Sequence, residues 1–230
     1  IDHCGEWAPS APRVEQVLRA HGPLLAGAAR TELAVPLPVH RGGYPWPQPT
    51  VNEITKPLHA RALLLSVAGQ QVAIVSLDTL MVPADLAARI AEGHGFPVIS
   101  VATHTHSGPG QYDSRLVPEV AALGFKNQAV FDALVKAGRD AIEAAKKNVA
   151  PVTMKISERR SEEFARPRSG DSVDPQLTRL QFSAGDKAIA ELYLVSAHPT
   201  YVVRSVAGLD GDYPAAIDTD PQLVRMVLQS

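Results

Sequence analysis

The sequence has little of several features that mark common classes of protein. A single cysteine, Cys4, excludes an internal disulfide framework. No apolar run reaches the roughly 18 residues that a membrane helix requires. The formal net charge is -2, and long runs of one sign are absent, so nothing indicates a nucleic-acid partner. Aromatic residues make up only 5% of the chain, which leaves alanine, valine and leucine to form the core.

Two common catalytic motifs are also missing. No glycine-rich phosphate loop precedes a predicted helix, and no serine stands in a nucleophile elbow. What the chain does have is length and apolar content: 230 residues, 45% of them hydrophobic, are enough for one large domain or two small ones. We expect residues 1–23 to be a leader or linker and residues 24–230 to form one domain.

The chain alternates between strand and helix patterns. Residues 36–57 contain eight prolines or paired glycines, which predicts a long structured loop, and loops of this length are usually functional or disordered. The fold class we expect is α/β (mixed α+β), with central mixed β-sheets flanked by helices. The expected elements are hairpins over 60–77 and 176–195, strands over 97–102 and 151–156, and helices over 83–92, 125–147 and from 221 onward.

The most informative segment is Ala102–Gly110, which reads ATHTHSGPG after a short buried-strand pattern. Residues two apart on a strand share a face, so His104 and His106 can face one site. Neutral imidazole is a common zinc ligand, and ligands bind where strands end in open α/β sheets. The alternative is that both imidazoles simply hydrogen-bond loop carbonyls.

His198 repeats this pattern, because it follows the apolar strand 190–195 and precedes Pro199. We therefore expect a metal site at strand C-terminal ends, with His104 and His198 brought together by the fold. Alone, His198 would read as a structural histidine. Asp78 also ends a strand, where it could orient a histidine or cap the next segment. The turn at 210–214 contains two carboxylates and is most simply structural.

These segments, in this order, resemble the N-terminal catalytic part of the neutral/alkaline (non-lysosomal) ceramidase family. The resemblance covers about residues 26–220, and its specific motifs are ATHTHSGPG and the HPT segment at 198–200. Weaker matches agree in order; they are Gly43-Tyr44, Ile54 with 57–63, 76–78, Arg160-Ser161, 173–177 with 180–182, and 212–214.

The resemblance implies a zinc-dependent amidohydrolase that cleaves ceramide to sphingosine and a fatty acid. It implies that His104 and His198 are zinc ligands and that His106 is a catalytic residue beside the metal. Arg160 would bind the developing oxyanion or the substrate, although its charged surroundings at 159–163 also fit a solvated surface run. Tyr44 would contact the substrate, a ceramide-like lipid amide.

Two departures from the family pattern limit this expectation. The family's Gly-Ile-His segment reads Glu53-Ile54-Thr55 here, so a histidine near the site is replaced. The family's remaining zinc ligands, a Glu and a Tyr, and its serine lie further downstream than Ser230. We therefore expect this chain alone to have little or no ceramidase activity.

Two other functions stay open: a metal hydrolase of another amide or ester, and a non-catalytic relative that keeps only the scaffold. Because enzymes of this family are often secreted or face a membrane, the resemblance implies a secreted, periplasmic or membrane-associated protein, with peripheral membrane contact. The sequence carries no readable signal of the oligomeric state.

Overall fold

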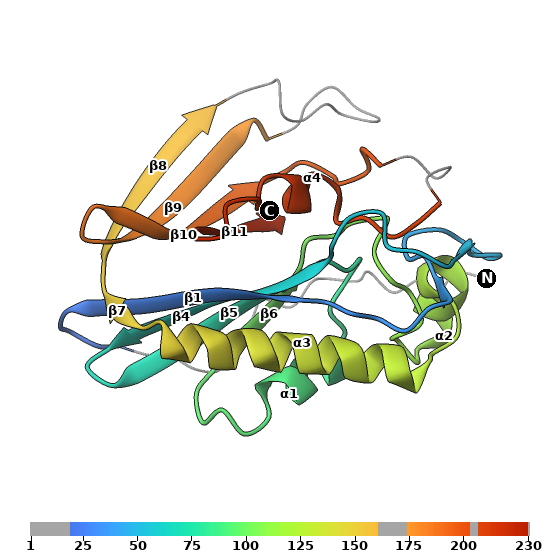
Figure 1. The fold of residues 1–230 in the computed structure, drawn as a ribbon, viewed down its shortest axis with the longest axis horizontal. Helices are drawn as coiled ribbons and strands as arrows, with labels where there is room; N and C mark the ends of the chain where they lie inside the picture. The colour runs from blue at the N-terminus through green and yellow to red at the C-terminus, as the bar shows by residue number, and fades with distance from the viewer. Residues whose placement is uncertain (1–18, 161–173, 203–206, 230) are drawn as a thin grey trace, which may run out of the picture.

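Two β-sheets lie face to face, and helices cover the outer face of one of them (Figure 1). The computed structural model describes residues 19–160, 174–202 and 207–229. Cys4 and most of the expected leader lie outside the described residues. The mixed sheets with flanking helices confirm the expected fold class.

The first sheet is mixed and has five strands. In spatial order they are β6 (Val98–Ala102), β5 (Gln70–Leu77), β4 (His59–Val67), β1 (Leu24–Glu32) and β7 (Ala150–Pro151). The hairpin β4–β5 is confirmed, with a turn at Ala68-Gly69. Helix α1 (Ala84–Ala91) connects β5 to β6, and these two strands run parallel. The helix over 83–92 and the strand over 97–102 were both expected. Strand β1 was not predicted as a strand, yet it occupies the position between β4 and β7.

Helix α3 (Gln128–Lys147) covers this sheet and confirms the strongest helix pattern of the sequence (Figure 1). It begins after Asn127, whose side chain accepts a hydrogen bond from the backbone N–H of Ala129 at 3.0 Å. Its buried face packs against β1 and β4. The approach to β1 is so close that a Cβ on Gly27 would lie 2.2 Å from the carbonyl oxygen of Ala145. Only glycine fits there.

Strand alternation divides the interior into two cores. On β4, Ala62 and Leu64 point to the helices, while Leu63 and Leu65 point to the second sheet. The second sheet contributes Phe182 and other residues to the core between the sheets; these include Ala190, Leu192, Val224 and Met226. The first sheet is therefore buried on both faces, which agrees with its nearly continuous apolar strands.

The second sheet has four strands, in the order β11 (Val224–Gln229), β10 (Lys187–Val195), β9 (Gln176–Ala184) and β8 (Thr153–Arg160). The hairpin β9–β10 and the strand predicted over 151–156 are confirmed. The helix expected from residue 221 is wrong, because residues 224–229 form a strand parallel to β10. Val224 and Met226 alternate into the core between the sheets, so the residues follow a period of two.

The proline-rich segment 36–57 is an ordered loop, as expected. It contains the short pair β2 (Val39–His40) and β3 (Thr50–Val51) and lies near the helical turns α2 (Leu116–Pro118) and η1 (Glu119–Leu123). One further short helix, α4 (Asp212–Ala216), precedes β11. Among the residues that the structure describes, no helix is both long and apolar enough to cross a bilayer.

Candidate metal centre

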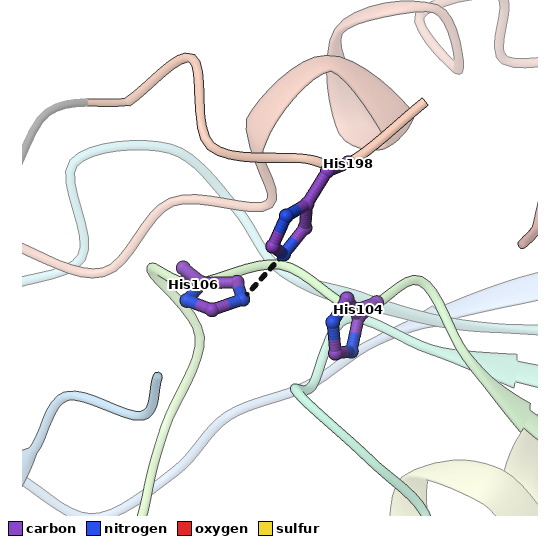
Figure 2. Close-up of side chains that lie close together, drawn as sticks. All are labelled: His104, His106 and His198. Atoms are coloured by element: carbon purple, nitrogen blue, oxygen red, sulfur yellow. Dashed lines mark hydrogen bonds between the residues drawn. The ribbon is translucent and has the colours of Figure 1, made fainter. Parts of the chain in front are cut away.

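Three histidines from two loops converge at the ends of the sheets (Figure 2). His104 and His106 lie just beyond Ala102, the last residue of β6 in the first sheet. His198 lies just beyond Val195, the last residue of β10 in the second sheet. The two sheets thus bring together residues that are far apart in the sequence, at strand C-terminal ends.

The three rings are close enough to share one ion. One ring nitrogen of each histidine lies within 4.8 Å of the others, so the group could hold a metal. The Nε2 atoms of His106 and His198 are 2.7 Å apart. The rings of His104 and His198 are stacked, with centroids 4.9 Å apart and planes tilted by 22°. Such a cluster of neutral nitrogen donors suits zinc.

Backbone carbonyls fix the orientation of two of these rings. The Nδ1 of His104 lies 2.7 Å from the carbonyl oxygen of Leu80, and the Nδ1 of His106 lies 3.0 Å from that of Gly43. A carbonyl oxygen only accepts hydrogen bonds, so each Nδ1 carries the proton. In the neutral rings the lone pair is then on Nε2, as metal-binding histidines require. The donor set therefore fits a zinc ion.

The backbone at the first loop is strained, because His104 has a φ of +65°. For residues other than glycine this region is costly and tends to occur at functional sites. The loop is held in place from both sides. The hydroxyl of Thr105 donates to the carbonyl of Asp210 at 3.0 Å, and the N–H of Asp210 donates to the carbonyl of Ser107 at 2.9 Å. The N–H of His106 also donates to the carbonyl of Pro199 at 3.3 Å.

The carboxylates that the sequence singled out have structural partners. Asp78 accepts hydrogen bonds from the backbone N–H of His59 and from the guanidinium of Arg61, both at 2.8 Å. The carbonyl of Leu80, not the carboxylate of Asp78, orients His104. Asp212 accepts from the N–H of Val202 at 2.8 Å, so the turn at 210–214 is a structural one that supports the loop of the histidines.

The structure places Tyr44 against the cluster and Arg160 at a strand end. The ring of Tyr44 meets that of His106 edge to face, with centroids 6.3 Å apart. Arg160 is the exposed last residue of β8, opposite Gln176 on the ladder, and residues 161–173 after it are not described. The role given to Arg160 stays a prediction.

Some residues of the site had no clear signal in the sequence. Leu80 and Gly43 act through their carbonyl groups, which every residue has. Arg41 is fully buried beside the cluster: its Nε lies 3.4 Å from the carbonyl oxygen of His106, and its Nη2 donates to the hydroxyl of Tyr44 at 3.3 Å. The one usable signal was the length and composition of the loop 36–57, which contains both Gly43 and Arg41.

An apolar cavity of about 450 Å³ lies next to the strand that carries His198. Aliphatic and aromatic side chains form most of its wall; they include Leu177, Val195, Ala197, Tyr201 and Tyr213. The hydroxyl of Tyr213 donates to the carbonyl of Ala197, the residue before His198, at 2.7 Å. The cavity and the cluster of three histidines are therefore joined through the backbone at Ala197 and His198.

Comparisons with known proteins agree with this architecture. A neutral ceramidase from Mycobacterium tuberculosis (strain ATCC 25618 / H37Rv) is 28% identical over 126 residues, which cover 48% of this chain and 20% of that protein. Two solved structures are 21% identical and each cover 91% of this chain: a ceramidase complexed with C2, at a TM-score of 0.79, and the neutral ceramidase from Pseudomonas aeruginosa, at 0.80.

The chain spans only part of these proteins: a fifth of the first and 38% and 39% of the solved chains. The model of the family described as neutral/alkaline non-lysosomal ceramidase, N-terminal, matches residues 36–213. That range includes the three histidines and both loops that hold them. The chain therefore belongs to the neutral/alkaline non-lysosomal ceramidase family, of which it carries the N-terminal region.

Proposed function

We propose that a protein containing this chain is a zinc-dependent amidohydrolase that cleaves the N-acyl amide of ceramide-type sphingolipids to sphingosine and a fatty acid. One observation carries the proposal: His104, His106 and His198 converge in a chain of the ceramidase family. The names of the similar proteins, a neutral ceramidase and a ceramidase complexed with C2, support the choice of substrate.

In this proposal His104 and His198 would hold the zinc ion, and His106 would lie beside it. The Glu and Tyr ligands that the family supplies downstream would complete the set. Zinc, when bound, activates a water molecule and polarises the carbonyl of the scissile amide. The proton on Nδ1 of His104, held by Leu80, keeps the lone pair of its Nε2 available for this role.

The remaining residues would bind substrate and handle protons. His106 keeps its Nδ1 proton on the carbonyl of Gly43, so its Nε2 is the atom that can accept a proton from the reacting groups. Tyr44 packs against that ring and would form one wall of the substrate site. Arg160 would bind the developing oxyanion, because a guanidinium is always charged and donates in a fixed geometry.

A lipid substrate is consistent with the surroundings of the cluster. The cavity beside Ala197 is lined mainly by apolar side chains and has room for a hydrocarbon chain. Because ceramides reside in membranes, we also propose peripheral membrane contact and a secreted, periplasmic or membrane-associated location.

Zinc binding by the 230-residue chain tests the metal site. After treatment with a chelator and dialysis, we expect the chain to take up zinc in calorimetric titration. His104→Ala and His198→Ala should each weaken binding by more than roughly tenfold, because each removes a nitrogen donor. His94→Ala is the control, since this ring stacks on Phe96. If neither this chain nor a protein that contains it binds zinc, or if His104→Ala changes only stability, the non-catalytic alternative holds.

Amide hydrolysis tests the substrate. A protein that contains this chain should release fatty acid from N-acyl sphingosines, and a chelator should abolish the release. The rate should depend on acyl length across a series from short to long chains. Equal rates along the series, or faster cleavage of small water-soluble amides, would instead support a metal hydrolase of another substrate class.

A further inference from the structure

A short segment of the proline-rich loop runs along the loop that carries His106. The N–H of Gly42 donates to the carbonyl of Gly108 at 2.9 Å, and the N–H of Gly110 donates to that of His40 at 2.6 Å. On its other side the segment is held by the N–H of Gly43, which donates to the carbonyl of Ala122 at 2.8 Å. The position of Gly43 is therefore fixed from two directions.

Gly43 decides which nitrogen of His106 faces the cluster. Its carbonyl oxygen lies 3.0 Å from Nδ1 of that ring and can only accept a hydrogen bond, so the proton is on Nδ1. In the neutral imidazole the lone pair is then on Nε2, which lies 2.7 Å from Nε2 of His198.

The same residue also makes room for the ring. A Cβ on Gly43 would lie 2.6 Å from Nδ1 of His106 and 2.8 Å from its Cα and Cγ atoms. Real Cβ atoms essentially never approach other atoms so closely, and the Cα of His106 is a backbone atom that cannot move away freely. The φ of Gly43 is +92°, where side chains other than hydrogen are strained. Glycine is thus required for two separate reasons.

We propose that Gly43 is a positioning residue for His106: its carbonyl selects the Nδ1–H tautomer, and its missing side chain lets the ring occupy its place. The catalytic part of this inference, the role of His106 in the reaction, rests on the proposed function. The placement of the ring itself can be measured without any turnover. Outer partners of this kind typically change metal affinity or activity by roughly 10–100-fold when they are altered.

The test compares Gly43→Ala with Gly69→Ala. Gly69 has a similar φ of +80°, but a Cβ there would meet nothing within 4 Å, so this control carries backbone strain alone. The tautomer is read by long-range nitrogen–proton NMR of the histidine rings at pH 8, above the ordinary imidazole pKa of about 6.5. A His106→Gln spectrum assigns the signal.

We expect the Nδ1–H tautomer of His106 in the wild-type chain and in Gly69→Ala, and its loss in Gly43→Ala. The rate of amide hydrolysis by a protein that contains the chain should fall by roughly tenfold or more only with Gly43→Ala. An unchanged tautomer in Gly43→Ala would overturn the inference. If neither the wild-type chain nor a protein that contains it bound zinc, the proposed function would fail, whereas the NMR result would still decide the role of Gly43.

A double-mutant comparison covers the case in which Gly43→Ala does not fold. His106→Ala removes the ring but keeps the Cα, which a Cβ on Gly43 would still approach to 2.8 Å. In that background Gly43→Ala should therefore lower the urea midpoint by less than it does in the wild-type chain, and the difference measures the collision with the ring. Folding that is restored by His106→Ala would support the inference. A double variant as unstable as Gly43→Ala alone would overturn it, because the collision would then involve other atoms.

Discussion

The buried guanidinium of Arg61 offers the sharpest test of how the two sheets are joined. Its side chain is 1% exposed and lies between Asp78 and Asp218, whose side chains are both 0% exposed. Asp78 follows β5 in the first sheet, whereas Asp218 precedes β11 in the second. Burial alone would lower the pKa of Arg61, but the two carboxylates raise it overall, so the charge is retained.

Arg61→Met would keep most of the volume and remove the charge. Arg30 would still pair with Asp218 at 2.8 Å, so that carboxylate keeps one cation. Asp78 would keep the hydrogen bond from the N–H of His59 and would lose its ion pair. Removing one partner of a buried pair typically costs 3–5 kcal/mol, and we expect about 4 kcal/mol here. This is a large part of the roughly 5–15 kcal/mol by which domains are stable.

The assay is urea denaturation of the chain, followed by circular dichroism. Arg89→Met is the control, because Arg89 pairs with Glu92 on the surface, with side chains 60% and 62% exposed. Exposed pairs contribute about 0–1 kcal/mol, so this variant should stay close to wild type. A loss below about 1 kcal/mol for Arg61→Met would refute the idea that an uncompensated buried carboxylate is left behind.

Two further predictions concern stability. Gly27→Ala should destabilise the chain by about 1–3 kcal/mol or prevent folding, because the new methyl group would collide with the carbonyl of Ala145; urea titration measures this. Burial lowers the pKa of both His59 and His94 below 6.5, so the unfolded chain gains protons first as the pH falls. The free energy of unfolding should therefore decrease below pH 6.5, by at most about 1.4 kcal/mol per pH unit for each ring. His59→Gln and His94→Gln should each make this decrease less steep. An unchanged slope in these variants would show that the two rings do not cause it.

The elements predicted correctly are those whose signals are local. The hairpin of β4 and β5 has a glycine turn between two apolar runs, and α3 has a helical period with an asparagine before its first turn. Strand β11 was mistaken for a helix because its six residues are too short to establish a period. It pairs with β10, a parallel strand from earlier in the chain. Such a distant pairing cannot be predicted from the residues of β11 alone.

Strand β1 was missed for a different reason. Its small residues pack against α3, where Gly27 allows the closest approach, so the strand lacks the bulky β-branched residues that indicate one. Arg30 on β1 stands opposite Arg61 on β4 in the strand register, and these two charged residues interrupt the apolar pattern of their strands. Their role becomes visible only when Asp218 from the second sheet is placed beside them.

For the site, side chains could be predicted and their supports could not. Two histidines at a strand end and a third at another strand end predicted one shared site, and the structure brings the three rings together. The alternative that both rings of the first loop bond carbonyls is also present in the structure, because each uses Nδ1 for that contact and leaves Nε2 for the cluster. The supports are the carbonyls of Leu80 and Gly43, and the sequence does not show that a backbone carbonyl will orient a ring. Gly43 was noted only as part of the Gly43-Tyr44 match to the family. Family resemblance added the order of the segments and the expectation of zinc.

The site is divided between the two sheets, and this has an energetic consequence. His104 and His106 extend from the first sheet and His198 from the second, so the separation of their nitrogens depends on how the sheets pack. The ion pairs of Arg61 tie those same sheets together. A metal that binds only the folded arrangement stabilises it in proportion to the logarithm of its concentration over Kd. Sheet packing and metal binding would therefore support each other, since both hold the same two strand ends at one distance.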